Sequence, residues 1–211
     1  MTVNLWTDPE HARWYLERRG GIPRREEGYE VLLEFLPERV ARVLDLGCGD
    51  GEVVGRVLDA RAEAEALAAD FSEEMLRRVR DRFAGSERVT IVEHDLGRPL
   101  PAEWGTFDVV VSAFAIHHVS DERKRTLYSE VHERLRPGGV FLNLEHVASA
   151  TPELHQGFLS ALQIAPEDDD PSNQLAAVEA QLGWLRDLGF EQVDCHWKWR
   201  ELALLAGVRP A

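Results

Sequence analysis

The sequence predicts an α/β protein with a doubly wound, mainly parallel sheet. From Val40 onward, short β-branched or apolar runs alternate with longer amphipathic runs, the pattern of a parallel sheet with helices on both faces. A glycine-rich turn follows the first apolar run, where such sheets bind ligands. The 211 residues, 44% of them hydrophobic, suffice to bury one sizeable core. We therefore expect a single domain over residues 1–211.

Seven strands and four helices are expected in alternation. Each strand is a short apolar or β-branched run, and each helix has apolar residues at helical spacing. In chain order the strands are 42–46, 65–70, 89–94, 107–113, 140–146, 192–199 and 202–206, and the helices are 52–62, 72–83, 120–135 and 174–188.

Local signals set the ends of these elements. Ser72 and Ser120 are predicted N-caps, and Pro137-Gly138-Gly139 breaks the third helix. The last two strands have no helix between them and are joined around Arg200-Glu201, which predicts an antiparallel hairpin at the sheet edge. Residues 1–37 and 148–173 lie outside the repeating core. We expect them to form an N-terminal helical lid and an inserted lid over a site.

The turn after the first strand reads Asp45-Leu-Gly-Cys-Gly-Asp-Gly51. Its glycines let the backbone approach a ligand closely, and the following helix offers unpaired amides. The spacing is GxGxG rather than the GxGxxG of dinucleotide sites. Asp45 would repel a diphosphate but attract an ammonium group. These features favour a zwitterionic ligand, such as the amino-acid end of S-adenosylmethionine.

Two further acidic residues follow strands at the same predicted edge. Asp70 ends the second strand about 20 residues beyond the glycines, where a carboxylate accepts hydrogen bonds from ribose hydroxyls. After the third strand, the Asp95 carboxylate suits the exocyclic amine of adenine, and the Leu96 amide suits the ring. Each acid alone also fits a strand-end cap. Their coincidence at one edge predicts an adenosine-containing ligand.

From Val43 to about Val147 the chain resembles the class I S-adenosylmethionine-dependent methyltransferase family. The likeness lies in the glycine turn, Asp70, Asp95-Leu96, residues 107–112 (Phe-Asp-Val-Val-Val-Ser) and residues 135–139 (Leu-Arg-Pro-Gly-Gly). It implies a Rossmann-like, seven-stranded sheet with an antiparallel last strand, the cofactor S-adenosylmethionine and the product S-adenosylhomocysteine. The expected cofactor contacts are Asp45, Gly47, Cys48, Gly49, Asp70, Phe71, Met75, Asp95, Leu96, Ala113 and His118, with Met75 beside the adenine.

Candidates for the acceptor side are less specific. Methyl transfer depends mainly on positioning, so a base is optional. His117 and His118 follow the fourth strand and are the candidate catalytic residues, although in the family these histidines are commonly structural. Arg24 or Arg25 would pair with the cofactor carboxylate or a substrate anion, or would be surface charges. The other substrate or lid candidates are Tyr15, Glu145, His146, Trp197 and Trp199.

Trp197 and Trp199 share one face of the sixth strand because side chains alternate along a strand. They would form an apolar or cation-binding wall. The more conservative interpretation packs them against the last helix, which contains Trp184 and Leu188.

Charge and composition narrow the function. The net charge of −14 disfavours a nucleic-acid partner. No apolar run approaches the roughly 20 residues that span a bilayer, and no signal sequence is visible, so we expect a cytoplasmic protein without a membrane partner. Cys48 and Cys195 are expected to be reduced, and no metal site is expected.

The expected function is transfer of a methyl group from S-adenosylmethionine to an oxygen, nitrogen or carbon of a small-molecule acceptor. A weaker likeness to the carboxy-S-adenosylmethionine synthase group, through Ile22-Pro23 and residues 190–199, leaves carboxylation of the cofactor by prephenate as an alternative. A non-catalytic cofactor-binding module is the third hypothesis. A homodimer is left open.

Overall fold

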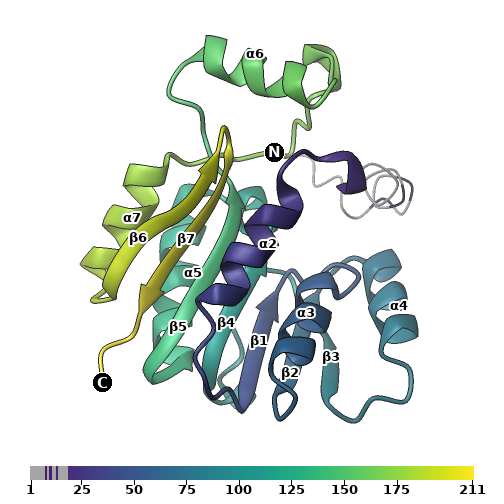
Figure 1. Cartoon of the computed structure of the whole chain (residues 1–211), viewed down its shortest axis with the longest axis vertical. Helices are drawn as coiled ribbons and strands as arrows, with labels where there is room; N and C mark the ends of the chain where they lie inside the picture. Colours follow the sequence, from purple (N-terminus) through teal and green to yellow (C-terminus); the bar gives the residue numbers. More distant parts are fainter. Residues whose placement is uncertain (1–7, 9, 11–12, 14–18) are drawn as a thin grey trace.

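The computed structural model describes residues 8, 10, 13 and 19–211. Its sheet has the strand order β3-β2-β1-β4-β5-β7-β6 (Figure 1). β1 to β5 pair in parallel, and β7 runs antiparallel to both of its neighbours. The predicted doubly wound, mainly parallel sheet and its final hairpin are confirmed. The strands are β1 (Arg42–Leu46), β2 (Glu65–Asp70), β3 (Val89–Glu93), β4 (Phe107–Ala113), β5 (Leu135–His146), β6 (Glu191–Trp199) and β7 (Leu202–Val208).

Helices cover both faces of the sheet. One face carries α2 (Arg25–Glu34), α3 (Glu52–Ala60) and α4 (Glu73–Arg82), and the other carries α5 (Asp121–Arg134) and α7 (Val178–Asp187) (Figure 1).

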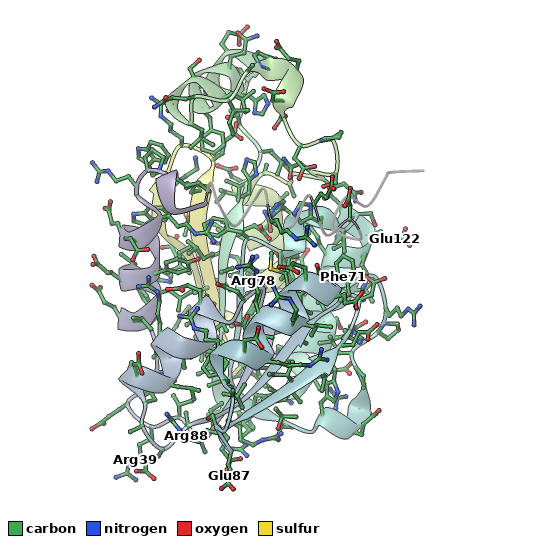
Figure 2. The ribbon with its side chains drawn as sticks, turned by 90° about the vertical axis from the view of Figure 1, so that its right-hand side faces the viewer. Arg39, Phe71, Arg78, Glu87, Arg88 and Glu122 are labelled. Carbon is green, nitrogen blue, oxygen red and sulfur yellow. The ribbon has the colours of Figure 1, made fainter. Side chains whose placement is uncertain are left out.

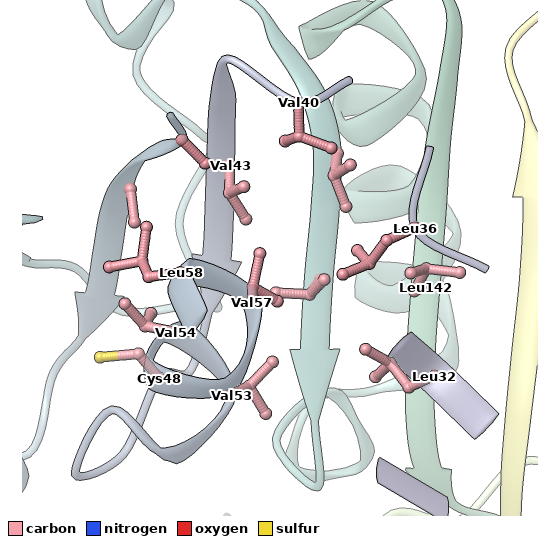
Figure 3. Packing of buried hydrophobic residues seen from close by; sticks show 14 of the residues in the cluster. Leu32, Leu36, Val40, Val43, Cys48, Val53, Val54, Val57, Leu58 and Leu142 are labelled. Atoms are coloured by element: carbon pink, nitrogen blue, oxygen red, sulfur yellow. The ribbon is translucent and has the colours of Figure 1, made fainter. Parts of the chain in front are cut away.

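Successive side chains of β1 enter the two cores alternately. Val43 belongs to the same cluster as Val53 and Val57 of α3, part of which Figure 3 shows, whereas Leu44 belongs to the cluster on the opposite face. By the same alternation, Asp45 is directed to the face that α3 covers.

Both predicted N-cap serines occupy the N-cap position, but only Ser120 makes a side-chain capping hydrogen bond. Ser120 caps α5 with its hydroxyl, which accepts a hydrogen bond from the Arg123 amide at 3.3 Å. Ser72 precedes α4 without a side-chain cap, and its amide donates to Asp70 Oδ1 at 2.9 Å. The start of α4 is therefore tied to the end of β2.

The third helix lies within one residue of its predicted bounds at each end, but the fifth strand begins earlier than expected. α5 ends at Arg134, and β5 begins at Leu135, so Pro137-Gly138-Gly139 lies inside the strand. Pairing with β4 shifts between Phe107 and Val109, and a proline is tolerated at such an irregularity. A Cβ on Gly139 would lie 2.9 Å from the Arg136 carbonyl oxygen, which explains the glycine.

The inserted segment 148–173 contains a helix that the sequence analysis missed, α6 (Pro152–Ala161). Its signals are Thr151 at the N-cap and Pro152 in the first turn. α6 lies beyond the carboxyl end of β5, at the top of Figure 1. Its buried Phe158 packs against the rings of His146 and Trp199, with centroid distances of 5.2 and 6.2 Å.

A polar cluster fastens α6 to the sheet. Glu201 is fully buried between β6 and β7, and it interacts with His146 Nε2 at 2.9 Å, His155 Nδ1 at 3.0 Å and the Ser149 hydroxyl. The other ring nitrogen of His155 lies 3.3 Å from Asp169 Oδ2. His155 thus bridges two carboxylates, which favours its charged form.

We expect α6 to loosen as the pH rises through the pKa of His155. Burial opposes the shift, but Glu201 and Asp169 raise this pKa above its usual value. The stabilisation is therefore complete below the unfolded pKa, about 6.5, and is lost as the pH rises through the higher folded pKa. Amide hydrogen exchange over 152–161, corrected for intrinsic rates, should accelerate as the pH rises above the unfolded pKa of about 6.5 and through the raised folded pKa of His155.

The variant His155→Gln should remove this pH dependence of exchange in α6, and exchange in α5 should stay unchanged. Glu201 affects stability only at low pH. Burial opposes the shift, but hydrogen bonds from His146, Ser149 and His155 lower the pKa of Glu201, so its stabilising contribution is lost only as the pH falls through that lowered pKa. A wild-type pH response that survives in the His155→Gln protein would contradict the assignment.

Candidate functional site

A cavity opens at the carboxyl ends of β1, β2 and β4, and all eleven residues expected to contact the cofactor line it. Figure 2 shows Phe71 toward this end of the molecule, with Arg39, Glu87 and Arg88 at the opposite end. The eleven are Asp45, Gly47, Cys48, Gly49, Asp70, Phe71, Met75, Asp95, Leu96, Ala113 and His118, and the other lining residues are Arg25, Tyr29, Asp50, Glu52, Val53, His94, Phe114, Ala115 and Val119.

The glycine turn forms one wall of the cavity. Gly47, Gly49 and Gly51 have φ values of +71°, +55° and +80°, in the left-handed region that favours glycine. A Cβ on Gly47 would lie 2.2 Å from the Ala115 Cβ, so the turn packs directly on the segment after β4. Gly51 is the N-cap of α3. The first amides of that helix therefore lie beside the cavity.

Asp45 is a buried carboxylate at the base of the cavity. It is 1% exposed, and within the described part of the chain neither of its oxygens accepts a hydrogen bond. Burial and the neighbouring charge of Asp70 raise its pKa to about 8, against the opposing effect of the Val54 amide. A buried carboxylate without an internal partner is costly, and a cationic ligand would compensate it.

Asp70 and Asp95 are held by backbone amides. Asp70 Oδ2 accepts from the Gly49 amide at 2.9 Å, and Oδ1 accepts from Ser72. Burial raises the pKa of Asp70, and these amides, with that of Phe71, oppose the shift. Asp95 Oδ1 accepts from the Gly97 amide at 2.8 Å. Both carboxylates thus have fixed orientations and further lone pairs for a ligand.

Arg25, Tyr29 and Phe114 also line the cavity and contact one another. The Arg25 guanidinium stacks 4.5 Å above the Phe114 ring, and its Nε donates to the Tyr29 hydroxyl at 2.9 Å. Phe114 has a φ of +55°, a strained value for a non-glycine residue and one that recurs at functional sites. The strain brings an aromatic ring beside a buried cation.

The structure places Arg24, another lid candidate, outside the cavity lining. Arg24 instead pairs with Glu27 at 2.7 Å on the surface. Tyr15 lies outside the described residues.

Of the two candidate catalytic histidines, His118 lines the cavity and His117 does not. His117 Nδ1 lies 2.6 Å from Glu145 Oε1, and both side chains are buried. Burial, together with His146 and Lys124, lowers the pKa of His117, and burial raises that of Glu145 to about 7. Glu145 and His146 also lie outside the cavity lining. This placement fits a structural pair behind His118.

The conservative interpretation of the two tryptophans, packing against the last helix, was wrong, and the apolar or cation-binding wall stays a prediction. Neither tryptophan lines the cavity. Trp197 packs against the cluster on the face that α2 and α3 cover, whereas α7 packs with Val193 and Cys195. A Cβ on Gly28 would lie 3.0 Å from Trp197 Cζ3, so Trp197 packs on α2, and Trp199 contacts Phe158 of α6. The reason is that α7 covers the opposite face of the hairpin. Both cysteines are free, as expected.

The reversed last strand and the cavity at the carboxyl edge define a Rossmann-like methyltransferase fold. The family model described as "Methyltransferase domain" matches residues 43–139. A demethylmenaquinone methyltransferase of Clavibacter sepedonicus is 32% identical over 187 residues, which cover 81% of this chain and 74% of that protein. The chain therefore belongs to the class I S-adenosylmethionine-dependent methyltransferases, and S-adenosylmethionine is its cofactor.

A further relative and a solved structure of the same fold are also similar to this chain. An uncharacterized methyltransferase of Mycobacterium tuberculosis is 35% identical over 130 residues, or 61% of each chain. The structure of human N-acetylserotonin methyltransferase with S-adenosylmethionine has a TM-score of 0.70 at 17% identity, and the match covers 98% of this chain and 58% of that one. The present chain thus spans about three fifths of these two proteins.

The described residues include no helix with the length and apolar character needed to cross a membrane.

Sequence reasoning missed several cavity residues. Five of them adjoin residues that were assigned to the site, which could have indicated them. These are Asp50, Glu52 and Val53 after the glycines at 47 and 49, and Phe114 and Ala115 after Ala113. His94 precedes the assigned Asp95 and gave the same signal, whereas Tyr29 gave none. Tyr29 reaches the cavity only because α2 packs across the sheet.

Proposed function

We propose that this chain transfers the methyl group of S-adenosylmethionine to an oxygen, nitrogen or carbon atom of a small-molecule acceptor. The observation that supports this most is Asp45, whose buried carboxylate matches the ammonium group of the cofactor. Asp70 would bind the ribose hydroxyls, and Asp95 the adenine amine. Met75, 2% exposed, and Leu96, 7% exposed, would supply apolar surface beside the adenine.

The residues of the cavity would hold the cofactor in place and shield the reacting groups from water. When bound, the cofactor supplies an electrophilic methyl group on a sulfonium, so the protein needs no electrophile of its own. Asp45 and Asp95 would fix the two ends of the cofactor and Asp70 its ribose, and the glycine turn would allow its close approach. Phe71, Phe114 and Val119 would exclude water from the reacting groups.

The acceptor side suits a flat molecule with an acidic hydroxyl. The Phe114 ring offers an aromatic face, and the Arg25 guanidinium stacked on it would stabilise negative charge on the acceptor. The similarity to a demethylmenaquinone methyltransferase points to the same type of acceptor. Reduced demethylmenaquinone is therefore the first acceptor to test.

The proposal is tested by calorimetry and mass spectrometry on the full chain. S-adenosylmethionine and S-adenosylhomocysteine should each bind with a stoichiometry of about one, and incubation with cofactor and acceptors should yield a methylated product. Failure to bind either molecule would refute the proposal. Tight binding without turnover across an acceptor library would favour the non-catalytic module, and a carboxylated cofactor formed with prephenate would favour the synthase alternative.

A further inference from the structure

The loop after α6 is hydrogen-bonded to the segment that contains His118. Gln174 donates from its backbone amide to the His117 carbonyl and from its side-chain Nε2 to the His118 carbonyl, each at 2.8 Å. Ser172, 4% exposed, places its hydroxyl oxygen 3.2 Å from His118 Nδ1. The insertion does not line the cavity, but it holds a residue that does.

The hydrogen bonds of Ser172 define the proton on His118. The Ser172 hydroxyl donates to Asp170 Oδ1 at 2.6 Å, and the same oxygen of Asp170 accepts from the Ser172 amide at 2.8 Å. The single hydroxyl proton is thus committed to the carboxylate. The Ser172 oxygen must then accept from His118 Nδ1, which places the proton of a neutral imidazole on Nδ1 and a lone pair on Nε2.

The surroundings keep this imidazole neutral. The groups that face it include the His117 ring, with centroids 4.0 Å apart, the backbone of Ser172, and the side chains of Asp170 and Glu145. Burial and His117 lower the pKa of His118, against the opposing charges of Asp170 and Glu145 and a backbone hydrogen bond of Ser172. A neutral ring is the form that accepts a proton.

We infer that Ser172, supported by Asp170, is a positioning residue that presents Nε2 of His118 to the acceptor as a proton acceptor. This inference rests on the proposed methyl transfer. The O–H or acidic C–H bond of the acceptor breaks, and its proton moves to Nε2. The acceptor atom forms a bond to the methyl carbon, and the carbon–sulfur bond breaks with its electron pair on sulfur. The acceptor class is a phenol, an enol or a comparably acidic carbon.

The experiment is nitrogen-15 NMR of the imidazole rings in the full chain saturated with S-adenosylhomocysteine, with the His118 signals assigned from His118→Gln. Wild type should show a protonated Nδ1 and an unprotonated Nε2. Ser172→Ala should lose this single tautomer, and Ser172→Thr, which keeps the hydroxyl, should retain it. Ser160→Ala is the matched control because that hydroxyl donates within α6 to Gln156 at 2.8 Å. Wild type with its proton on Nε2, or a tautomer that Ser172→Ala leaves intact, would overturn the inference.

Titration with phenol tests the acceptor class in the same complex. The Nε2 resonance should shift as its lone pair accepts the phenol hydroxyl, and no response at Nε2 would overturn the assigned class. Should Ser172→Ala fail to fold, the wild-type tautomer alone decides. Calorimetry of S-adenosylhomocysteine on wild type separates the two proposals, because binding with the wrong tautomer refutes the role of Ser172 and leaves methyl transfer standing.

Discussion

Gly47→Ala is expected to abolish measurable cofactor binding and to destabilise the protein by several kcal/mol. The left-handed φ of Gly47 costs an alanine about 1 to 2 kcal/mol. Its Cβ would also lie 2.2 Å from the Ala115 Cβ, a contact that only a backbone shift relieves, at a further cost of about 1 to 3 kcal/mol. Because the glycine turn is a wall of the cavity, the shift should reduce cofactor affinity by about 100-fold or more.

Gly85→Ala is the control that separates the cost of a left-handed φ from the cost of a steric clash. Gly85 has a φ of +80°, and its Cβ would meet no atom within 4 Å. It is not among the residues that line the cavity. This variant should lose about 1 to 2 kcal/mol of stability and bind S-adenosylmethionine like wild type. Urea unfolding and calorimetry measure the two effects, and equal losses of affinity in both variants would contradict the structural account of the turn.

Asp45→Asn is expected to stabilise the cofactor-free protein near pH 7.5 while lowering its affinity for S-adenosylmethionine by about 100-fold or more. Asn keeps the shape of Asp45 but carries no charge, so the ammonium group loses its partner, a loss of about 2 to 5 kcal/mol for a buried pair.

The stability effect follows from the raised pKa of about 8. The unfolded pKa is about 3.9, so wild type loses stability as the pH rises from there toward about 8, and the asparagine protein does not. The melting-temperature advantage of Asp45→Asn should therefore shrink as the pH is lowered toward about 4.

Asp108→Asn is the matched control at the other end of the sheet. Asp108 accepts from the Ala41 and Arg42 amides at 2.8 Å each and pairs with Arg136 at 2.7 Å. Its loss should destabilise the fold and leave cofactor binding intact, the reverse of the result at Asp45. An Asp45→Asn protein that binds S-adenosylmethionine like wild type would remove the main support for the proposed site.

The parallel part of the fold could be predicted because its signals are local. Each strand from β1 to β4 is a short apolar run, and glycines or serines mark the turns and helix starts beside them. Because the carboxyl ends of parallel strands meet at one edge, Asp45, Asp70 and Asp95 could be grouped without a structure. The start of β5 was missed because proline and two glycines indicate a break, whereas pairing with β4 accommodates them as an irregularity.

The acceptor side could not be predicted in the same way because tertiary packing creates it. The sequence does not indicate that Arg25 reaches the cavity and Arg24 does not, since the two are adjacent and chemically identical. Only the start of α2 between them separates their environments. The positions of Trp197, Ser172 and Phe114 likewise depend on how α2 and the insertion pack on the sheet.

The place of β7 in the sheet has a consequence for how the chain folds. β7 follows β6 in sequence but lies between β6 and β5, so the sheet cannot be completed by adding strands in chain order. Arg209, just after β7, donates to the carbonyl of His132, a separation of 77 residues. Such distant contacts slow folding, and until β7 docks, β5 exposes an unpaired edge that other chains can join. Refolding yield should therefore fall with protein concentration, and holding the hairpin in place should matter more for the yield than stabilising the site.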